Sequence, residues 1–333
     1  MTTMSPRIPR DPRRTRVLGA ALAIVALPVI LVPIEAVSYY VRNRSNGSIV
    51  SSGEMRKYLL HVPASYDRAK PTPLVISMHG GALWDAAQKE ISQWNPVADR
   101  EGFIVVYPSG ARGNGPGHWR TGDRAGRDVV FISDLIDKLS AEYNIDPARI
   151  YANGLSNGGG MSFVLSCTLS NRIAAVGMVN AAQLLPWSWC TDTRPVPMIT
   201  FHGTADPVVP YTGGKTWVAP RAFPHVPTWT ANWAKRNRCA AEPFDSPVAA
   251  NVTRRTYTGC ADNASVELTR SGEEVMTGPA AGRCPNGCAG PSAMASMPPA
   301  RCGPFTVSIP SPGSSAASGR SLSASSRVPR RTP

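Results

Sequence analysis

The chain has 333 residues, 42% of them hydrophobic, which is enough for one large domain with appendages. Its formal net charge is +13, but the basic residues gather toward the two ends of the sequence. Because neither a basic-aromatic pattern nor zinc-finger spacing accompanies this charge, the composition argues against a nucleic-acid-binding protein.

The N-terminal segment, residues 1–44, joins a basic flank to an apolar run. Five arginines between residues 7 and 16 precede the uncharged stretch 17–34. A positive flank before an apolar stretch is typical of an export signal, or of an anchor whose N-terminus stays in the cytoplasm. The alternative is a buried core helix. We expect an extracellular or periplasmic protein, either secreted or anchored to the cytoplasmic membrane by an uncleaved segment.

Residues 45–270 form the predicted folded domain. After a polar linker over residues 42–53, short apolar runs predict strands at 55–62, 74–78, 102–107, 150–153 and 197–201. Apolar positions at helical spacing predict a helix over 129–139, and residues 146–149 predict a turn. Continuous apolar strands that alternate with helices indicate a mostly parallel sheet covered on both faces, which is an α/β architecture.

A nucleophile motif follows one of these strands. Residues 154–158 read Gly-Leu-Ser-Asn-Gly and match the G-x-S-x-G elbow, in which Ser156 stands on a sharp strand-to-helix turn. The glycines are needed because larger side chains would collide with neighbouring backbone there. The alternative is a glycine-rich turn with an incidental serine. The preceding strand and the helix-compatible run 160–165 favour the elbow.

Two further strand ends complete the predicted site. Residues 79–81, His-Gly-Gly, follow strand 74–78, and we assign the oxyanion donors to the N–H groups of Gly81 and Asn157. His79 is interpreted as a structural residue that holds this loop. Asp206 follows strand 197–201, in the chain order expected for the acid that orients a catalytic histidine. The alternative is a turn aspartate before Pro207.

Seven cysteines fall into two groups. Cys167, Cys190, Cys239 and Cys260 lie in the body of the chain and allow three pairings, of which the nearest-neighbour pairing closes two modest loops. Such bridges would persist outside the cytoplasm. The other three, Cys284, Cys288 and Cys302, predict no zinc site because no histidine lies near them.

The motifs at 79–81, 146–151, 154–159 and 202–206 together resemble the secreted polyhydroxybutyrate depolymerases and feruloyl esterases. The resemblance runs from about Met55 to Leu268. It implies an α/β-hydrolase that cleaves carboxylic esters through Ser156, with Asp206 as the triad acid and no cofactor or metal. It supports the two nearest-neighbour disulfides. The implied substrates are polymeric or oligomeric esters, namely polyhydroxyalkanoate oligomers or feruloyl or acetyl esters of polysaccharide, and also simple aryl esters.

The triad histidine that the resemblance implies is missing. It is expected in a glycine-rich stretch shortly after a strand such as 266–268, yet the chain has no histidine after His225. His225 follows Asp206 in the right order, but it lies only about twenty residues later, in a proline-bounded loop. We keep it as a substitute base, with a surface loop histidine as the favoured alternative.

The composition changes abruptly at Ser271. Residues 271–333 contain no Lys and no Asp, and we predict a disordered tail. Codons for residues 272–279, read one frame away, permit Gly-Gly-Gly-His-Asp-Trp-Pro, and the same shift over 292–306 permits a string like the family's last helix. We infer a change of reading frame between about Leu268 and Ser271, which would remove the histidine and the last strand–helix unit of the fold.

Two other functions compete with an impaired esterase. A non-catalytic protein could keep the pocket and bind an ester or a polysaccharide, with Trp84, Trp94 and Trp119 as stacking surfaces, although aromatic residues in such loops are more often simply packed. The other alternative is a non-functional translation product. The sequence leaves the oligomeric state open.

Overall fold

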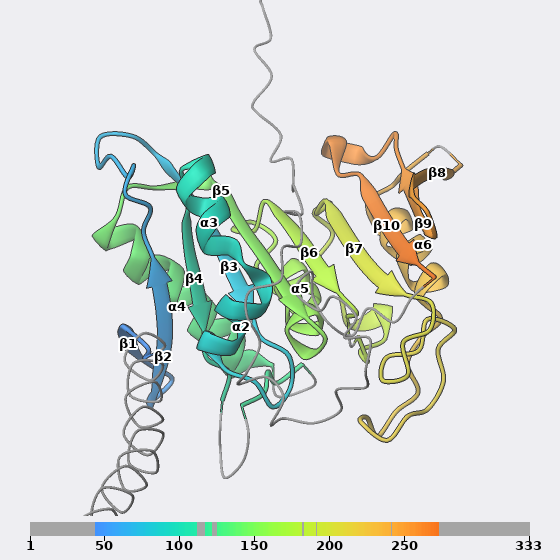
Figure 1. Cartoon of the computed structure of the whole chain (residues 1–333), viewed down its shortest axis with the longest axis horizontal. Helices are drawn as coiled ribbons and strands as arrows, with labels where there is room; N and C mark the ends of the chain where they lie inside the picture. Colours follow the sequence, from blue (N-terminus) through green and yellow to red (C-terminus); the bar gives the residue numbers. More distant parts are fainter. Residues whose placement is uncertain are drawn as a thin grey trace, which may run out of the picture. The chain divides into compact units, whose positions relative to one another are not determined.

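The computed structural model describes residues 44–111, 117–121, 125–181, 183–190, 192–240 and 242–272 (Figure 1). The predicted export segment, nearly all of the predicted tail, and Cys284, Cys288 and Cys302 lie outside the described residues. In the part of the chain that is described, no helix has the length and apolar content needed to cross a membrane.

A mixed sheet is the centre of the described fold. Its strands are β1 (Gly47–Ser51), β2 (Glu54–His61), β3 (Thr72–Met78), β4 (Ile104–Pro108), β5 (Ile145–Leu155), β6 (Ala175–Val179), β7 (Met198–Gly203), β8 (Phe244–Ala249), β9 (Val252–Tyr257) and β10 (Val266–Ser271). They follow the order β1-β2-β4-β3-β5-β6-β7-β10-β9-β8. Neighbouring strands from β4 to β10 are parallel, whereas the pairs at the two edges are antiparallel. The predicted mostly parallel sheet is confirmed.

Helices cover both faces of this sheet. They are α2 (Asp85–Ser92), α3 (Trp94–Glu101), α4 (Gly126–Glu142), α5 (Asn157–Thr168) and α6 (Val226–Arg236), with 3-10 turns at Trp187–Trp189 and Ala261–Asn263. Side chains alternate along β3: Ile76 and Met78 join the core formed with α4 and α5, whereas the Ser77 hydroxyl accepts a hydrogen bond from Gln88 of α2. The helices α2 and α4 therefore lie on opposite faces, and Figure 1 shows α2 in front of the strands.

The central strands are buried along their whole length. Every residue of β3 and of β4 is buried, which explains why both read as continuous apolar runs and not as alternating ones. Helix α4 buries a stripe with helical spacing: Phe131, Ile132, Leu135, Ile136 and Leu139. The strands and helices predicted from apolar runs are present at nearly the predicted positions.

The structure corrects two local predictions. The polar linker over residues 42–53 contains a strand, β1, which pairs with β2 through a two-residue turn at Ser52 and Gly53. Both turn residues have positive φ, as type I′ hairpins require. Residues 146–149, predicted as a turn, belong to β5, where the register against β3 shifts. Asp146 still accepts the N–H of Ala148, so a local side-chain turn is embedded in the strand.

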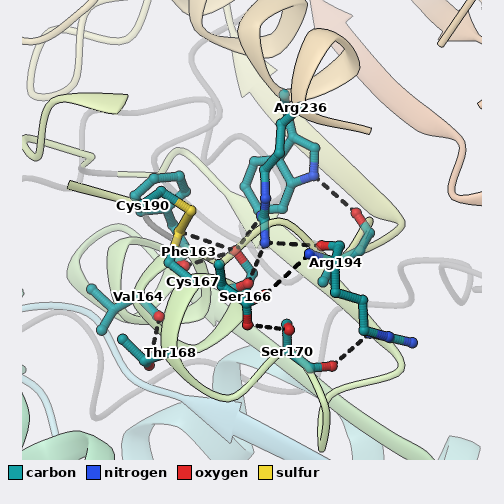
Figure 2. Close-up of a disulfide and its surroundings, with 12 residues drawn as sticks. Phe163, Val164, Ser166, Cys167, Thr168, Ser170, Cys190, Arg194 and Arg236 are labelled. Atoms are coloured by element: carbon teal, nitrogen blue, oxygen red, sulfur yellow. Dashed lines mark hydrogen bonds between the residues drawn. A yellow bond between two sulfur atoms is a disulfide. The ribbon is translucent and has the colours of Figure 1, made fainter. Parts of the chain in front are cut away.

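Two disulfides fasten α5 and α6 to their surroundings. Cys167 at the end of α5 is bonded to Cys190, and Cys239, just after α6, is bonded to Cys260. Figure 2 shows Arg236 reaching from α6 to the end of α5 beside the first bond, where its guanidinium donates to the Ser166 hydroxyl at 3.0 Å. The nearest-neighbour pairing is confirmed.

Aromatic rings fill the space between α5 and α6. The ring centre of Phe163 in α5 lies 5.0 Å from that of Trp187 and 5.6 Å from that of Trp233 in α6. Both pairs have the edge-on arrangement that aromatic rings prefer. The Trp233 indole N–H donates to the Val196 carbonyl at 2.9 Å, so the buried polar atom is satisfied. This packing holds α6 against β10, which pairs with β7, the strand that precedes the predicted acid.

Candidate active site

Ser156 occupies a strained turn between β5 and α5. Its φ of 50° and ψ of −113° lie in a region that L-residues rarely adopt, and its N–H donates to the Val179 carbonyl of β6 at 2.8 Å. Such a conformation costs about 1–3 kcal/mol and persists only where the surroundings enforce it. The predicted elbow geometry is present.

The two glycines of the elbow are required by the close approach of other backbone. A Cβ on Gly154 would lie 2.3 Å from the Gly158 carbonyl carbon, and a Cβ on Gly158 would lie 2.2 Å from the Met78 carbonyl oxygen. Neither distance is compatible with a side chain. The sequence reasoning named this cause, and the structure identifies the partners as the turn itself and the end of β3.

The predicted oxyanion donors lie beside each other. β3 and β5 are neighbouring parallel strands, with Met78 paired to Gly154, so their following loops meet at one edge. A Cβ on Gly81 would be 3.8 Å from the Cβ of Asn157. Asn157 is the first residue of α5, where backbone N–H groups have no partner within the helix and favour negative charge.

His79 is a structural residue. It is fully buried, its Nε2 accepts the N–H of Gly110 at 2.9 Å, and its Nδ1 lies 2.7 Å from the Gly80 carbonyl, to which it donates in that tautomer. Both ring nitrogens therefore serve the loop that carries Gly81. The interpretation of His79 as a holding residue, and not a catalytic one, agrees with these bonds.

Asp206 is buried, and only one of its two carboxylate oxygens accepts hydrogen bonds from the described residues. Oδ1 accepts the N–H groups of Val208 at 2.8 Å and Val209 at 3.0 Å, as in an Asx turn. Oδ2 is also buried, and among the described residues it has no hydrogen-bond partner. The turn role weighed from the sequence is thus present, but it accounts for only one of the two oxygens.

The serine and the aspartate lie at the same edge of the sheet. Ser156 follows β5 and Asp206 follows β7, with β6 between these parallel strands. Two strand spacings separate β5 from β7, about 10 Å. Asn180 links the loops: it follows β6 with a φ of 46°, and its Oδ1 accepts the Gly203 N–H at 3.3 Å. Asn180 was not predicted from the sequence, although Asn is enriched among residues with positive φ.

The histidine nearest to Asp206 in the chain points elsewhere. His202 Nε2 is 3.9 Å from Asp206 Oδ2 but only 2.7 Å from the Val209 carbonyl, so its hydrogen bond goes to the carbonyl. Burial lowers the pKa of His202, opposed by the Val209 hydrogen bond and by the charge of Asp206. His202 is therefore a neutral core residue of β7.

None of the remaining histidines pairs with Asp206. The chain has five histidines, and all of them lie in the described residues. His61 bonds Asp99 at 2.8 Å, and His225 is exposed at the start of α6, where its Nδ1 lies 2.9 Å from the Thr228 hydroxyl. Its ring also lies 6.3 Å from that of Tyr211. No contact joins His225 to Ser156 or Asp206 within the described part of the chain.

The tryptophans proposed as stacking surfaces differ in exposure. Trp119 is 2% exposed and cannot stack on a ligand, so that proposal is wrong for this residue. Trp94 packs edge-on against Phe103. Trp84 is 40% exposed, and Trp217, which the sequence reasoning did not single out, is 87% exposed in the loop after β7.

Comparison with known proteins identifies the same scaffold. Residues 56–185 match the family described as esterase PHB depolymerase. The matched part contains Gly81 and Ser156 and ends before Asp206. The resemblance predicted from the motifs is confirmed.

Two curated relatives are feruloyl esterases. The chain is 32% identical over 225 residues to feruloyl esterase B of Piromyces equi, an alignment that covers 64% of this chain and 41% of the relative. It is 30% identical over 166 residues to feruloyl esterase C of Emericella nidulans, covering 48% of this chain and 58% of the relative. The chain therefore spans about half the length of these relatives.

A solved structure shares the fold. The acetyl xylan esterase from Aspergillus awamori aligns with a TM-score of 0.51 and 16% identity, over 68% of this chain and 91% of that chain. At this identity the likeness speaks for the fold alone. The predicted α/β-hydrolase architecture is confirmed, and the relatives are carboxylic ester hydrolases by name.

Proposed function

We propose that this protein is a serine esterase scaffold that cleaves carboxylic esters through an acyl-enzyme on Ser156. Asp206 is the acid of the triad, and the backbone N–H groups of Gly81 and Asn157 stabilise the oxyanion. The base that should stand between Ser156 and Asp206 is missing from the sequence as written, so the activity is impaired.

The unpaired oxygen of Asp206 carries this proposal. A buried carboxylate oxygen without a partner is costly, because an unsatisfied buried polar group costs about 1–3 kcal/mol and a charged one costs more. Such a group is expected where a partner has been removed or where a ligand completes it. In a triad, this oxygen accepts the Nδ1–H of the histidine that serves the serine.

The chemistry follows from the positions of the groups. The Ser156 hydroxyl attacks the ester carbonyl while a base takes its proton, and the carbonyl oxygen becomes an oxyanion between the two N–H donors. Collapse of this intermediate expels the alcohol, which takes up the proton, and leaves an acyl-serine. Water then repeats the sequence and releases the acid. Without a base the first step is slow, although roughly 10³–10⁴-fold acceleration over water can remain.

The substrate class is proposed from the relatives. The matched proteins are named as feruloyl and acetyl xylan esterases and as PHB depolymerase esterases. We propose feruloyl or acetyl esters of polysaccharide, or polyhydroxyalkanoate oligomers. We further propose that the protein acts outside the cytoplasm, because its two disulfides persist only in an oxidising compartment.

A non-catalytic binding protein is the second candidate. The exposed indoles of Trp84 and Trp217, in the loops after β3 and β7, favour it because such rings can stack on sugar or aromatic groups. A protein of this kind would keep the pocket and bind the same esters without turnover.

Rescue by imidazole tests the esterase. Small imidazole can enter the position of the missing side chain, accept the Ser156 proton and donate to Asp206. We expect slow hydrolysis of p-nitrophenyl butyrate that rises with imidazole concentration. Ser156→Ala and Asp206→Asn serve as controls, and the rate with Ser156→Ala measures hydrolysis by imidazole itself. Equal rates for the wild type and Ser156→Ala at every imidazole concentration would rule out the esterase.

Two other outcomes have definite meanings. Full activity without imidazole would show that the chain contains its own base, and His225→Ala would then test whether His225 supplies it. Binding of a feruloylated oligosaccharide without turnover, with or without imidazole, would favour the binding protein.

A further inference from the structure

A short segment, Gly117 to Arg120, touches both loops that supply the candidate oxyanion donors. The Trp119 N–H donates to the Asn157 Oδ1 at 2.6 Å, and the Asn157 Nδ2 donates to the Trp119 carbonyl at 3.1 Å. Two opposed hydrogen bonds fix the Asn157 side chain and with it the first residue of α5. The side chain of the residue after the nucleophile is thus tied to a segment 38 positions away in the sequence.

The same segment holds the loop after β3 on both sides of Gly81. The Ala82 N–H donates to the Gly117 carbonyl at 2.8 Å, and the Trp119 indole N–H donates to the His79 carbonyl at 3.0 Å. The Trp119 ring also lies 5.3 Å from the His79 ring. Gly81 therefore lies between two residues that are each bonded to this segment.

A buried ion pair between Arg56 and Asp128 anchors the segment at Arg120. The Arg120 N–H donates to Asp128 Oδ2 at 2.7 Å, while Asp128 Oδ1 accepts from the Arg56 guanidinium at 2.8 Å. The side chains of Arg56 and Asp128 are 5% and 0% exposed, and the guanidinium lies 3.9 Å from the centre of the Phe131 ring. A buried pair of this kind contributes little net stability, and its best-attested use is to specify one geometry.

The bonds close into a ring. Arg56 also donates to the Ser109 carbonyl at 3.2 Å, and the next residue, Gly110, donates its N–H to His79 Nε2. Hydrogen bonds and chain neighbours together lead from Arg56 through Ser109 and Gly110 to His79. They continue through Trp119, Arg120 and Asp128 back to Arg56. Because each member is joined to the next, the segment cannot shift without leaving several buried donors and acceptors unpaired, which is unfavourable.

We propose that residues 117–120 form a clamp that positions the two oxyanion donors, with Trp119 as its central positioning residue and the Arg56–Asp128 pair as its anchor. The inference rests on the proposed function in one respect: it takes Gly81 and Asn157 as the donors. It deepens that function by naming the residues that set the distance between them.

Binding of a carboxylate tests the clamp without requiring turnover. Butyrate should place one oxygen between the N–H groups of Gly81 and position 157, and titration of the full ¹⁵N-labelled chain reports both amides. Asn157→Ala removes both bonds to Trp119 but keeps the backbone donor, and Trp119→Phe removes the indole hydrogen bond to His79 and reduces the ring contact while it keeps the backbone bonds to Asn157. Asn144→Ala is the matched control, because its side-chain amide bonds the exposed Arg68 carbonyl at 3.0 Å.

We expect Asn157→Ala to weaken butyrate binding by roughly tenfold or more, because small displacements of a positioned group cost up to about 10²-fold. Trp119→Phe should weaken it less, and Asn144→Ala not at all. A thermal midpoint close to that of the wild type would show that a variant's weaker butyrate binding does not come from unfolding. In imidazole-assisted hydrolysis, Asn157→Ala should lower kcat with little change in KM.

Three results decide the matter. Wild-type affinity and unchanged amide shifts in both Asn157→Ala and Trp119→Phe would overturn the clamp and leave the esterase untouched. Silent amides in a wild type that hydrolyses esters would place the donors elsewhere and overturn the clamp as well. Butyrate binding that the variants lose, in a protein without any turnover, would support the clamp while the esterase fails.

Discussion

Ser156 combines a reactive position with an unfavourable backbone conformation. Its positive φ places the hydroxyl at the tip of the turn, and the surroundings that enforce it are the Val179 carbonyl and the tight contact between Gly154 and Gly158. Strain of this kind is characteristic of functional sites, because a residue chosen for stability alone would be glycine.

Replacement of Ser156 by glycine should therefore stabilise the fold relative to replacement by alanine. Alanine keeps the Cβ that makes a φ of 50° costly, whereas glycine removes this strain. Glycine also raises the conformational entropy of the unfolded chain, which offsets part of the stabilisation. We expect Ser156→Gly to exceed Ser156→Ala by about 1 kcal/mol in free energy of unfolding. Denaturant unfolding measures the difference, and equal stabilities would show that the turn is unstrained.

His202 makes the stability of the fold depend on pH. Its pKa is lowered from 6.5 by burial, so the folded state binds fewer protons than the unfolded state below about pH 6.5. The free energy of unfolding should be insensitive to this group above pH 6.5 and should fall as the pH drops below it. The carboxyl groups with lowered pKa values, such as Asp245 and Glu54, act in a more acidic range.

Comparison of His202→Gln with the exposed control His225→Gln isolates this effect. The difference in stability between pH 7.5 and 5.5 should shrink in His202→Gln and stay as in the wild type in His225→Gln. Parallel curves for all three proteins would show that His202 does not carry the pH dependence.

At the scale of elements, the predictable parts were those that local chemistry determines. The buried strands β3, β4 and β7 are recognisable in the sequence as apolar runs. The elbow is recognisable as a glycine pattern between a strand and a helix. The strands β8 and β9 are mostly exposed or half-buried and show no buried face, so no apolar pattern marks them. The apolar run that contains β6 is interrupted by Gly177, a residue type that is depleted in strands, and this glycine hides the strand.

The candidate site follows the same division. Gly81, Ser156 and Asp206 were predictable because each follows a strand that the sequence reveals. Trp119 was not, because its bonds to Asn157 and His79 join segments 38 and 40 residues apart through loops. Long-range hydrogen bonds leave no periodic trace in a single sequence.

The disulfides should contribute measurable stability to the elements that they join. Cys239–Cys260 closes a loop with a sequence separation of 21, so Cys239→Ser with Cys260→Ser should lower the free energy of unfolding by about 2–4 kcal/mol. The matched control replaces Cys284, Cys288 and Cys302 by serine and should leave it unchanged, because we predict that this tail is not part of the domain. If the control variant lost stability and the Cys239→Ser, Cys260→Ser variant did not, the tail cysteines and not this disulfide would stabilise the domain.

At the scale of the whole molecule, the character of the chain changes at residue 271. Before that point the chain has the strands and the disulfides described above, and residues 56–185 match the esterase PHB depolymerase family. From that point the composition changes, and the sequence that follows contains no histidine that could complete the triad proposed for Ser156 and Asp206. We propose that a change of reading frame accounts for both facts, since the shifted frame contains a glycine-rich histidine motif.

Restoring that frame tests the account most directly. The chain as written and a chain that carries the shifted frame from about Leu268 onward are compared in hydrolysis of p-nitrophenyl butyrate, each with its Ser156→Ala control. We predict that the restored chain is faster by roughly 10³-fold or more, since loss of a triad histidine costs at least that much, and that Ser156→Ala abolishes the gain. Equal and serine-dependent activity of the two chains would contradict the account, because a base within the written sequence would then serve Ser156.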